Sequence, residues 1–192
     1  PAAVRLARHY LDEGKRGNAV NVLEKTWTLN PHPALLPLWK DAAPLMKGDN
    51  AQRLRWHEKL IALQPASIDA HMAAASAAMD EQLWGVARQH LDTAGNIGTP
   101  PPARFYHMRA RLAQAQHRPD EAALMLRRAA DAPAEKTWIC RETGNIYESW
   151  SPVAVPHGNF NTIVWDFPQP FRAAIRSNDP ADLLIAAPNV RA

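Results

Sequence analysis

The sequence predicts a mainly α-helical protein made of repeated helix pairs, followed by a small β-hairpin or ribbon module. Two observations predict the helical part: turn residues recur at a fixed spacing, and so do small residues on the helices. A third, a group of short β-prone runs rich in tryptophan, predicts the β module. We expect helical repeats over residues 1–133, the β module over 134–166 and a proline-rich tail over 167–192.

The spacing of turn residues indicates the type of repeat. Gly14 and Gly48 are 34 residues apart, and so are Pro31 and Pro65. Glycine favours the left-handed backbone of a tight turn, and proline ends a helix. A 34-residue period is typical of tetratricopeptide repeats, in which each unit is a helix, a turn and a second helix. The expected architecture is therefore a tetratricopeptide-like α-α superhelical array.

Small residues follow the same period. Ala19 recurs two periods later as Ala87, and Ala122 follows 35 residues after that. A small side chain at such a position lets two helices approach closely. About four helix pairs are expected, of which the third and fourth span about residues 67–97 and 102–131.

The second pair, at about residues 33–65, is the least regular. Pro37 and Pro44 are expected to interrupt its first helix. Asp41 and Arg53 stand where small packing residues are expected. This pair should therefore form with distorted packing.

Charge and residue usage exclude several classes of function. The 22 Lys and Arg nearly balance 19 Asp and Glu, and no basic run tracks a phosphate backbone, so nucleic-acid binding is not expected. A single cysteine, Cys140, excludes an internal disulfide. No apolar run approaches the ~18 residues of a membrane span. Because the chain opens at Pro1 within a helical pattern, we expect it to be the C-terminal part of a longer protein.

Motifs for catalysis and for cofactors are missing from the sequence. The eight glycines form neither a phosphate loop nor a dinucleotide-binding pattern, and no G-x-S-x-G occurs. The eight histidines form no H-E-x-x-H, and no C-x-x-C-H is present. We expect a protein that is not an enzyme and has no catalytic residues and no cofactor.

A helical repeat array offers a concave surface lined by the first helix of each unit, which is the predicted partner-binding site. The predicted partner-binding residues are Arg8, Asp12, Met72, Ser76, Arg104, His107, Arg111 and Gln114. The projected lining also includes Leu38, Ala42, Leu45 and Met79. Arg104, His107 and Arg111 share one helix face, a basic strip suited to a peptide with an acidic group or a C-terminal carboxylate. The alternatives are ordinary solvated side chains and, for the two methionines, a place in the core.

Three segments of the repeats carry a family resemblance: Leu23–Trp27, Asn30–Pro33 and Leu83–Leu91. They resemble the C-terminal half of HemY-type proteins, over about residues 3–166. HemY proteins of alphaproteobacterial type end in a small ribbon with two C-x-x-C-G turns. The residues here that follow its frame are Trp138, Cys140, Thr143, Gly144, Trp150, Ala154, His157, Gly158, Phe160, Thr162 and Trp165.

The resemblance implies a degenerate zinc ribbon. Such a ribbon binds zinc through four ligands, two from each turn. The spacing is kept, but only Cys140 and His157 can ligate zinc, because Thr143 and Ala154 have replaced the other two ligands. We expect no bound metal, vestigial ligand positions at Cys140 and His157, and aromatic packing in place of the ion. A β module without a metal-binding ancestor predicts nearly the same structure.

The resemblance also implies a bacterial inner-membrane protein associated with haem or porphyrin biosynthesis. It would be tethered through N-terminal membrane segments, with this region on the cytoplasmic side. The predicted function is a protein-interaction scaffold that holds a protein or peptide in the concave groove. Two alternatives stay open: a carrier of haem, porphyrin or metal, using the histidines and Cys140, and a scaffold in lipopolysaccharide assembly, where proteins also join repeats to a metal ribbon.

Overall fold

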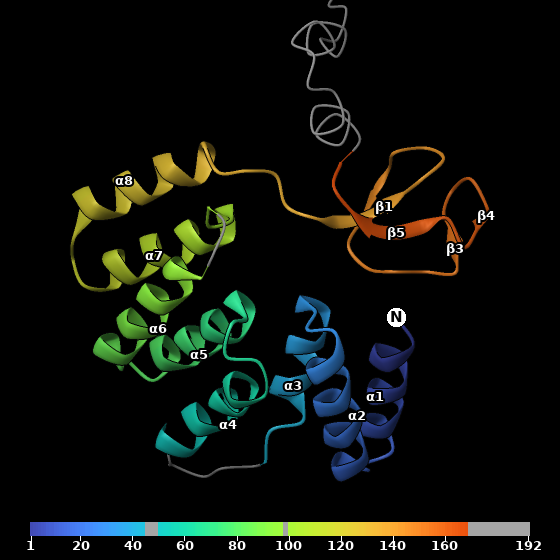
Figure 1. The fold of residues 1–192 in the computed structure, drawn as a ribbon, viewed down its shortest axis with the longest axis horizontal. Coiled ribbons are helices and arrows are strands. Elements are labelled where there is room, and N and C mark those ends of the chain that lie inside the picture. The colour runs from blue at the N-terminus through green and yellow to red at the C-terminus, as the bar shows by residue number, and fades with distance from the viewer. Residues whose placement is uncertain (45–49, 98–99, 169–192) are drawn as a thin grey trace, which may run out of the picture. The chain divides into compact units, whose positions relative to one another are not determined.

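Helices build the first part of the chain and short strands the second (Figure 1). The computed structural model describes residues 1–44, 50–97 and 100–168. The chain divides into two units, residues 1–133 and 134–192, and each is considered by itself below. The described residues form eight α-helices and a small antiparallel sheet, which confirms the expectation of a mainly helical fold with a small β module.

The helices of the first unit pack as consecutive hairpins. Their bounds are α1 Ala2–Asp12, α2 Arg16–Leu29, α3 Leu36–Asp41, α4 Asn50–Leu63, α5 Ile68–Asp80, α6 Trp84–Asn96, α7 Ala103–Ala115 and α8 Pro119–Ala130. Three-residue turns join α1 to α2, α5 to α6 and α7 to α8, and the two helices of each pair pack together (Figure 1). The first helices of neighbouring pairs also touch, because α1 contacts α3 and α5 contacts α7.

These three hairpin turns share one backbone conformation. Each has a single left-handed residue: Gly14 with φ 73°, Gln82 with φ 58° and His117 with φ 57°. Its N–H donates to the carbonyl three residues earlier, and the next N–H donates to the carbonyl five residues before itself. This pairing is that of a Schellman turn, which satisfies the last carbonyls of a helix. Residues 14, 82 and 117 are 68 and 35 apart, so the turn follows the predicted period.

Two sets of alanines lie at fixed distances from these turns. Seven residues before the left-handed residue are Ala7, Ala75 and Ala110, and five residues after it are Ala19, Ala87 and Ala122. All six are at most 3% exposed. Burial of such small side chains on both helices of a pair is what close helix packing requires.

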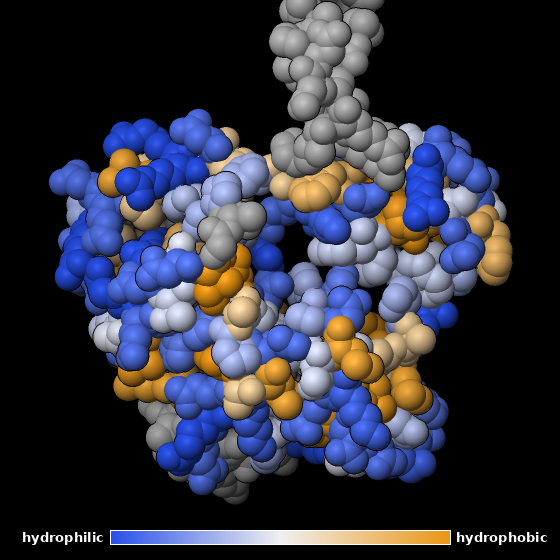
Figure 2. Space-filling view, in the orientation of Figure 1, coloured by the Kyte–Doolittle hydropathy of each residue, from blue (hydrophilic) through white to orange (hydrophobic). Residues whose placement is uncertain are grey.

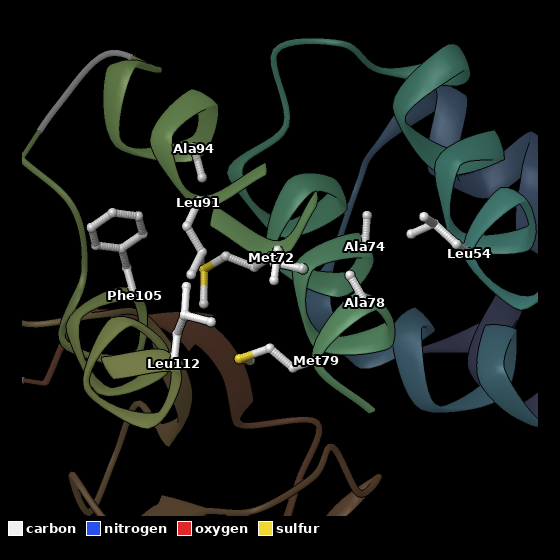
Figure 3. Close-up of a cluster of buried hydrophobic side chains, with 11 residues drawn as sticks. Leu54, Met72, Ala74, Ala78, Met79, Leu91, Ala94, Phe105 and Leu112 are labelled. Atoms are coloured by element: carbon white, nitrogen blue, oxygen red, sulfur yellow. The ribbon is translucent and has the colours of Figure 1, made fainter. Parts of the chain in front are cut away.

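One core of the helical unit lies between α4, α5, α6 and α7 (Figure 3). Met72 and Met79 point from α5 toward Phe105 and Leu112 of α7 (Figure 3). Both methionines are buried, so they contribute to the core, which was the alternative given for them above. Leu54 of α4 approaches the opposite side of α5.

The second pair is irregular in the structure as well. A 3₁₀ turn, Pro33–Leu35, leads into α3, and Pro37 lies in the first turn of that helix. The prediction that Pro37 interrupts a helix is wrong, because a first-turn residue needs no N–H partner within the helix. Arg53, at an expected alanine position, donates two hydrogen bonds to Glu81. These bonds lower the pKa of the Glu81 carboxyl.

Two tryptophans join the helices of this irregular pair. Trp39 of α3 and Trp56 of α4 are stacked, with ring centroids 4.4 Å apart. The indole N–H of Trp39 donates to the Trp56 carbonyl at 3.1 Å, and that of Trp56 donates to the Trp39 carbonyl at 2.8 Å. Both residues are buried. The pair therefore combines a large buried apolar area with satisfied polar groups.

The β unit contains β1 Thr137–Cys140, β2 Ile146–Tyr147, β3 Val153–Ala154, β4 Asn159–Phe160 and β5 Ile163–Asp166. The first strand is the centre of a three-stranded antiparallel sheet in the order β2-β1-β5, and β3 and β4 form a separate hairpin. Val153 is directly opposite Phe160 in that hairpin, and both are exposed. Apolar atoms reach the surface over this hairpin (Figure 2).

Two turns of the β unit have the same geometry. Gly144 and Gly158 both have φ 75°. Each glycine N–H donates to the carbonyl four residues earlier, that of Cys140 at 2.9 Å and that of Ala154 at 2.8 Å. Cys140 and Ala154 are fully buried in one cluster with Trp138. Three partly buried aromatic residues pack against this cluster: Tyr147, Trp150 and Trp165.

Candidate binding groove

A groove of about 430 Å³ crosses the helical unit between α3, α5 and α7. Its described lining residues are Pro33, Leu36, Pro37, Lys40, His57, Asp69, Met72, Ala73, Ser76, Ala77, Asp80, Arg104 and Met108. Most of these side chains are apolar, and the charged ones belong to two ion pairs. The groove is therefore a candidate site for an apolar ligand.

One stripe of α5 forms the floor of the groove. From Asp69 to Asp80 the lining residues of this helix are spaced three and four apart, which places them on a single face. The middle of the stripe has only small side chains, Ala73, Ser76 and Ala77. Between the two acidic ends, Met72 is the one long side chain of the described lining of this helix, so the floor is low over Ala73, Ser76 and Ala77.

The alanine-rich sequence of α5 explains why it can serve the groove and the core together. Ala74, Ala75 and Ala78 are completely buried on the core side. Ala73 and Ala77 line the groove on another face. Alanine has the highest helix propensity, so the helix remains regular although few of its side chains are large.

Each acidic end of the stripe is paired with a cation from a different wall. Asp80 lies 3.7 Å from the ammonium of Lys40 of α3. Asp69 forms an ion pair with Arg104 of α7. The two positive charges of the described lining are thus matched by two negative charges.

His57 of α4 adds no charge at neutral pH. Burial is the main cause that lowers the pKa of its imidazole below the usual 6.5, and Lys40 lowers it further, whereas Asp80 raises it. The neutral ring is therefore the main form at pH 7. Its Nδ1 atom is buried and has no hydrogen-bond partner in the described part of the chain.

The predicted site residues are only partly brought together. Met72, Ser76 and Arg104 line the groove. Arg111 and Gln114 line a second, smaller pocket of about 240 Å³. The predicted basic strip is therefore divided, because Arg104 turns to Asp69 while Arg111 faces the other pocket.

Met79 of the projected lining also borders the second pocket, whereas Arg8, Asp12 and His107 are not among the described lining of either pocket. Arg8 forms an ion pair with Asp41 at 3.0 Å, whereas Asp12 and His107 are exposed. Leu45 lies outside the described residues. Sequence reasoning missed Lys40, His57, Asp69 and Asp80 as groove residues.

A second polar cluster links α4, α5 and α6. His71 and His90 place their Nδ1 atoms 3.4 Å apart, and the Nε2 of His71 is 3.2 Å from the Pro65 carbonyl oxygen. Glu58 lies 3.7 Å from the Nε2 of His90. Burial first, and then the charge of His71, lower the pKa of His90, while Glu58 raises it. Across the described ranges, no group of three metal-ligating side chains occurs.

In the β unit, the four ribbon positions divide into two kinds. Cys140 and Ala154 share the core, whereas Thr143 and His157 are exposed. The thiol of Cys140 is hydrogen-bonded to the hydroxyls of Thr143 and Thr162, the latter at 3.3 Å. These bonds lower the thiol pKa to about 7, although burial acts in the opposite direction.

Comparison with known proteins shows a similarity but no family. The sequence matches no family model. It is 29% identical over 171 residues to the probable magnetosome protein Mms48 of Magnetospirillum gryphiswaldense. The match covers 86% of this chain and 36% of the relative, so the chain spans about a third of that protein. Of the helices in the described residues, none is long and apolar enough to cross a membrane.

Proposed function

We propose that the protein is a non-enzymatic interaction scaffold whose helical unit holds a segment of another protein in the groove. The observation that carries the proposal is the groove itself: a mostly apolar channel with a low alanine floor, built mainly from α3, α5 and α7, which belong to different helix pairs. Clefts lined by apolar side chains with a few placed polar groups are the usual form of binding sites.

We further propose that the helix pairs form a tetratricopeptide-like superhelix. The recurring Schellman turn and the two buried alanine sets support this finer assignment. In such an array the first helices of successive units line the concave face. The groove uses α3, α5 and α7, which would be the first helices of the second, third and fourth units.

The proposed cellular setting comes from two similarities. The HemY-type resemblance suggests a scaffold tethered to the bacterial inner membrane, on its cytoplasmic side, in haem or porphyrin biosynthesis. The similarity to a probable magnetosome protein suggests a role associated with magnetosomes. A partner identified in the groove would choose between these two settings.

Site-specific crosslinking in the native bacterium tests the proposal. A photoreactive benzoylphenylalanine replaces Ala73 on the groove floor or, as a control, the exposed Ala123 on α8. We expect irradiation to join a distinct protein to the groove position and not to the control position. Equal labelling at both positions, or no adduct at position 73, would contradict a partner-binding groove.

A further inference from the structure

The charges of the groove cancel within the groove itself. Lys40 and Arg104 are the cations of its described lining, and Asp80 and Asp69 are the anions that pair with them. Asp69 is the more buried partner, with a side chain only 17% exposed. A cation paired in this way attracts an incoming carboxylate only weakly, because the negative potential of the paired aspartate cancels much of the positive potential.

The cancellation changes the chemistry expected from the sequence. The sequence predicts Arg104 in a basic strip that binds an acidic group, but its ion pair with Asp69 removes it from that role. An acidic peptide would also meet repulsion from Asp69 and Asp80, one at each end of the floor. Truncating or displacing a partner of a compensated pair leaves a charge without its counterion, which is costly where the pair is partly buried.

The length of the apolar stretch sets the size of the ligand. Asp69 and Asp80 are eleven residues apart on α5, which corresponds to about 16 Å along the helix axis. An extended peptide covers this distance with about five residues. Between the two ion pairs such a segment contacts Met72, Ala73 and Ala77 of the floor and the apolar side chains of both walls.

We infer that the groove binds an uncharged, apolar polypeptide segment of about five residues, seated on the α5 floor between the Lys40–Asp80 and Asp69–Arg104 ion pairs. This inference rests on the proposed function and adds the chemical class of the partner. Affinity comes from burial of apolar surface, reduced by the costs of association. The two ion pairs exclude acidic segments and set the ends of the channel.

A random peptide library tests the chemistry. Nine-residue peptides displayed on phage are selected on the full chain and counted by sequencing. We expect enrichment of Leu, Ile, Met, Phe and Pro over about five consecutive positions, without enrichment of Asp or Glu. The affinity of a selected synthetic peptide should change less than about twofold between low and high salt, because screening acts on charge pairs and not on apolar contacts.

Two variants place the peptide in the groove. Ala73→Glu puts a charge on the floor and should weaken binding at least about tenfold, whereas Ala123→Glu on the exposed face of α8 should leave it unchanged. The double variant Asp69→Asn, Asp80→Asn releases both cations, so selection on it should now enrich Asp and Glu. Asp92→Asn, which breaks the pair with Arg109 outside the groove lining, is the matched control.

Selection of acidic peptides by the unaltered chain would overturn the inference, and so would a steep loss of affinity with salt. Selection of apolar peptides that bind Ala73→Glu as well as the unaltered chain would overturn it too. The crosslinking experiment keeps the two proposals separate. If a crosslinked adduct forms at position 73 but the library selects acidic peptides, the scaffold proposal stands and the inference of an apolar ligand is wrong. If the library selects apolar peptides but no adduct forms in the cell, the inferred ligand class stands and the scaffold proposal is wrong.

Discussion

The irregular helix pair and the β unit each lack residues that their predicted motif requires, the repeat in one case and the ribbon in the other. They differ in how closely their turns keep the residue type of the motif. In the second helix pair, Asp41 and Arg53 occupy alanine positions, and the stacked Trp39 and Trp56 join the helices. In the β unit, two of the four ribbon positions cannot ligate metal, and Trp138 packs on its neighbours in the core. In both regions, tryptophan side chains pack near positions at which the residues expected from the motif are absent.

The difference lies in the turns. The helical unit has glycine, glutamine or histidine at its left-handed position, whereas the two matching turns of the β unit have Gly144 and Gly158. A third left-handed residue of the β unit, Asn161 with φ 56°, lies outside these two turns. The helical turn ends a helix whose own hydrogen bonds already hold the chain, so it tolerates the strain of a side chain there. The β turns have only two-residue strands beyond them, at Ile146–Tyr147 and Asn159–Phe160. The turn geometry of a motif can thus be present where the residues that the motif needs for its chemistry are not.

The largest effect is expected from adding metal ligands to the β unit. The double variant Thr143→Cys, Ala154→Cys adds two thiolates to Cys140 and His157, which completes a three-cysteine, one-histidine set. Because each turn already has the same glycine geometry, we expect about one equivalent of zinc by elemental analysis and a large rise in the unfolding temperature of the β unit. The double variant with serine at both positions should bind none. A folded cysteine variant without zinc would show that the two turns are not equivalent.

Removal of an indole from the irregular pair should have the next largest effect. Trp39→Ala removes a buried ring and the indole N–H that donates to the Trp56 carbonyl. We expect a loss of about 3–5 kcal/mol in the free energy of unfolding, measured by denaturant titration followed by circular dichroism. Trp84→Ala, at a partly buried position on α6, is the control and should lose less. A loss below about 1 kcal/mol for Trp39→Ala would mean that the stacked pair does not hold α3 to α4.

The tolerance of the helical turn can be measured directly. Gln82→Gly relieves a left-handed side chain and should stabilise the protein by about 0.5–1 kcal/mol. Gly14→Ala should destabilise by about 1 kcal/mol, and an added Cβ there meets nothing within 4 Å, so the change reports the backbone alone. Gly17→Ala, inside α2 with open space around it, should instead be stabilising. Thermal unfolding resolves these three signs.

The smallest expected effect separates the two units by pH. In the helical unit, burial lowers the pKa of His32, His57 and His90, so below pH 6.5 the unfolded chain binds more protons than the folded chain. The free energy of unfolding of this unit should therefore fall as the pH decreases below about 6.5. In the β unit, the Cys140 pKa is lowered from 9.0 to about 7, so stability should fall as the pH decreases from about 9 to about 7.

Hydrogen exchange with peptide resolution, corrected for the intrinsic pH dependence of exchange, measures the two windows separately. Cys140→Ser should remove the slope of the β unit between about pH 9 and 7 and leave the helical unit as it was. A single common slope in both units would contradict this assignment of the titrating groups.

Much of the fold could be predicted because its signals are local. The spacing of Gly14, Ala19 and Ala87 locates turns and close contacts, and the bounds of α5 to α8 lie within a few residues of the expected pairs. Gln82 and His117 share the turn conformation but are not glycines, so composition alone did not mark them. The two backbone hydrogen bonds of the turn recur at these positions, although the residue type does not.

The site was less predictable because its charges pair across the fold. Helical register placed Met72, Ser76 and Arg104 on the right face of their helices. The partners of the cations, Asp69 for Arg104 and Asp80 for Lys40, come from another helix at sequence separations of 35 and 40 residues. No local spacing encodes such a pairing, so the sequence indicates a basic strip where the structure has cations paired with aspartates.

The alanines on the groove face of α5 have a consequence for the entropy of binding. A long side chain that contacts a ligand must give up rotamers, at roughly 0.5–1.5 kcal/mol for each one immobilised. Ala73 and Ala77 have no rotamers to lose. A partner that settles on this floor therefore pays mainly for its own ordering, and the floor is equally ready before and after the partner leaves.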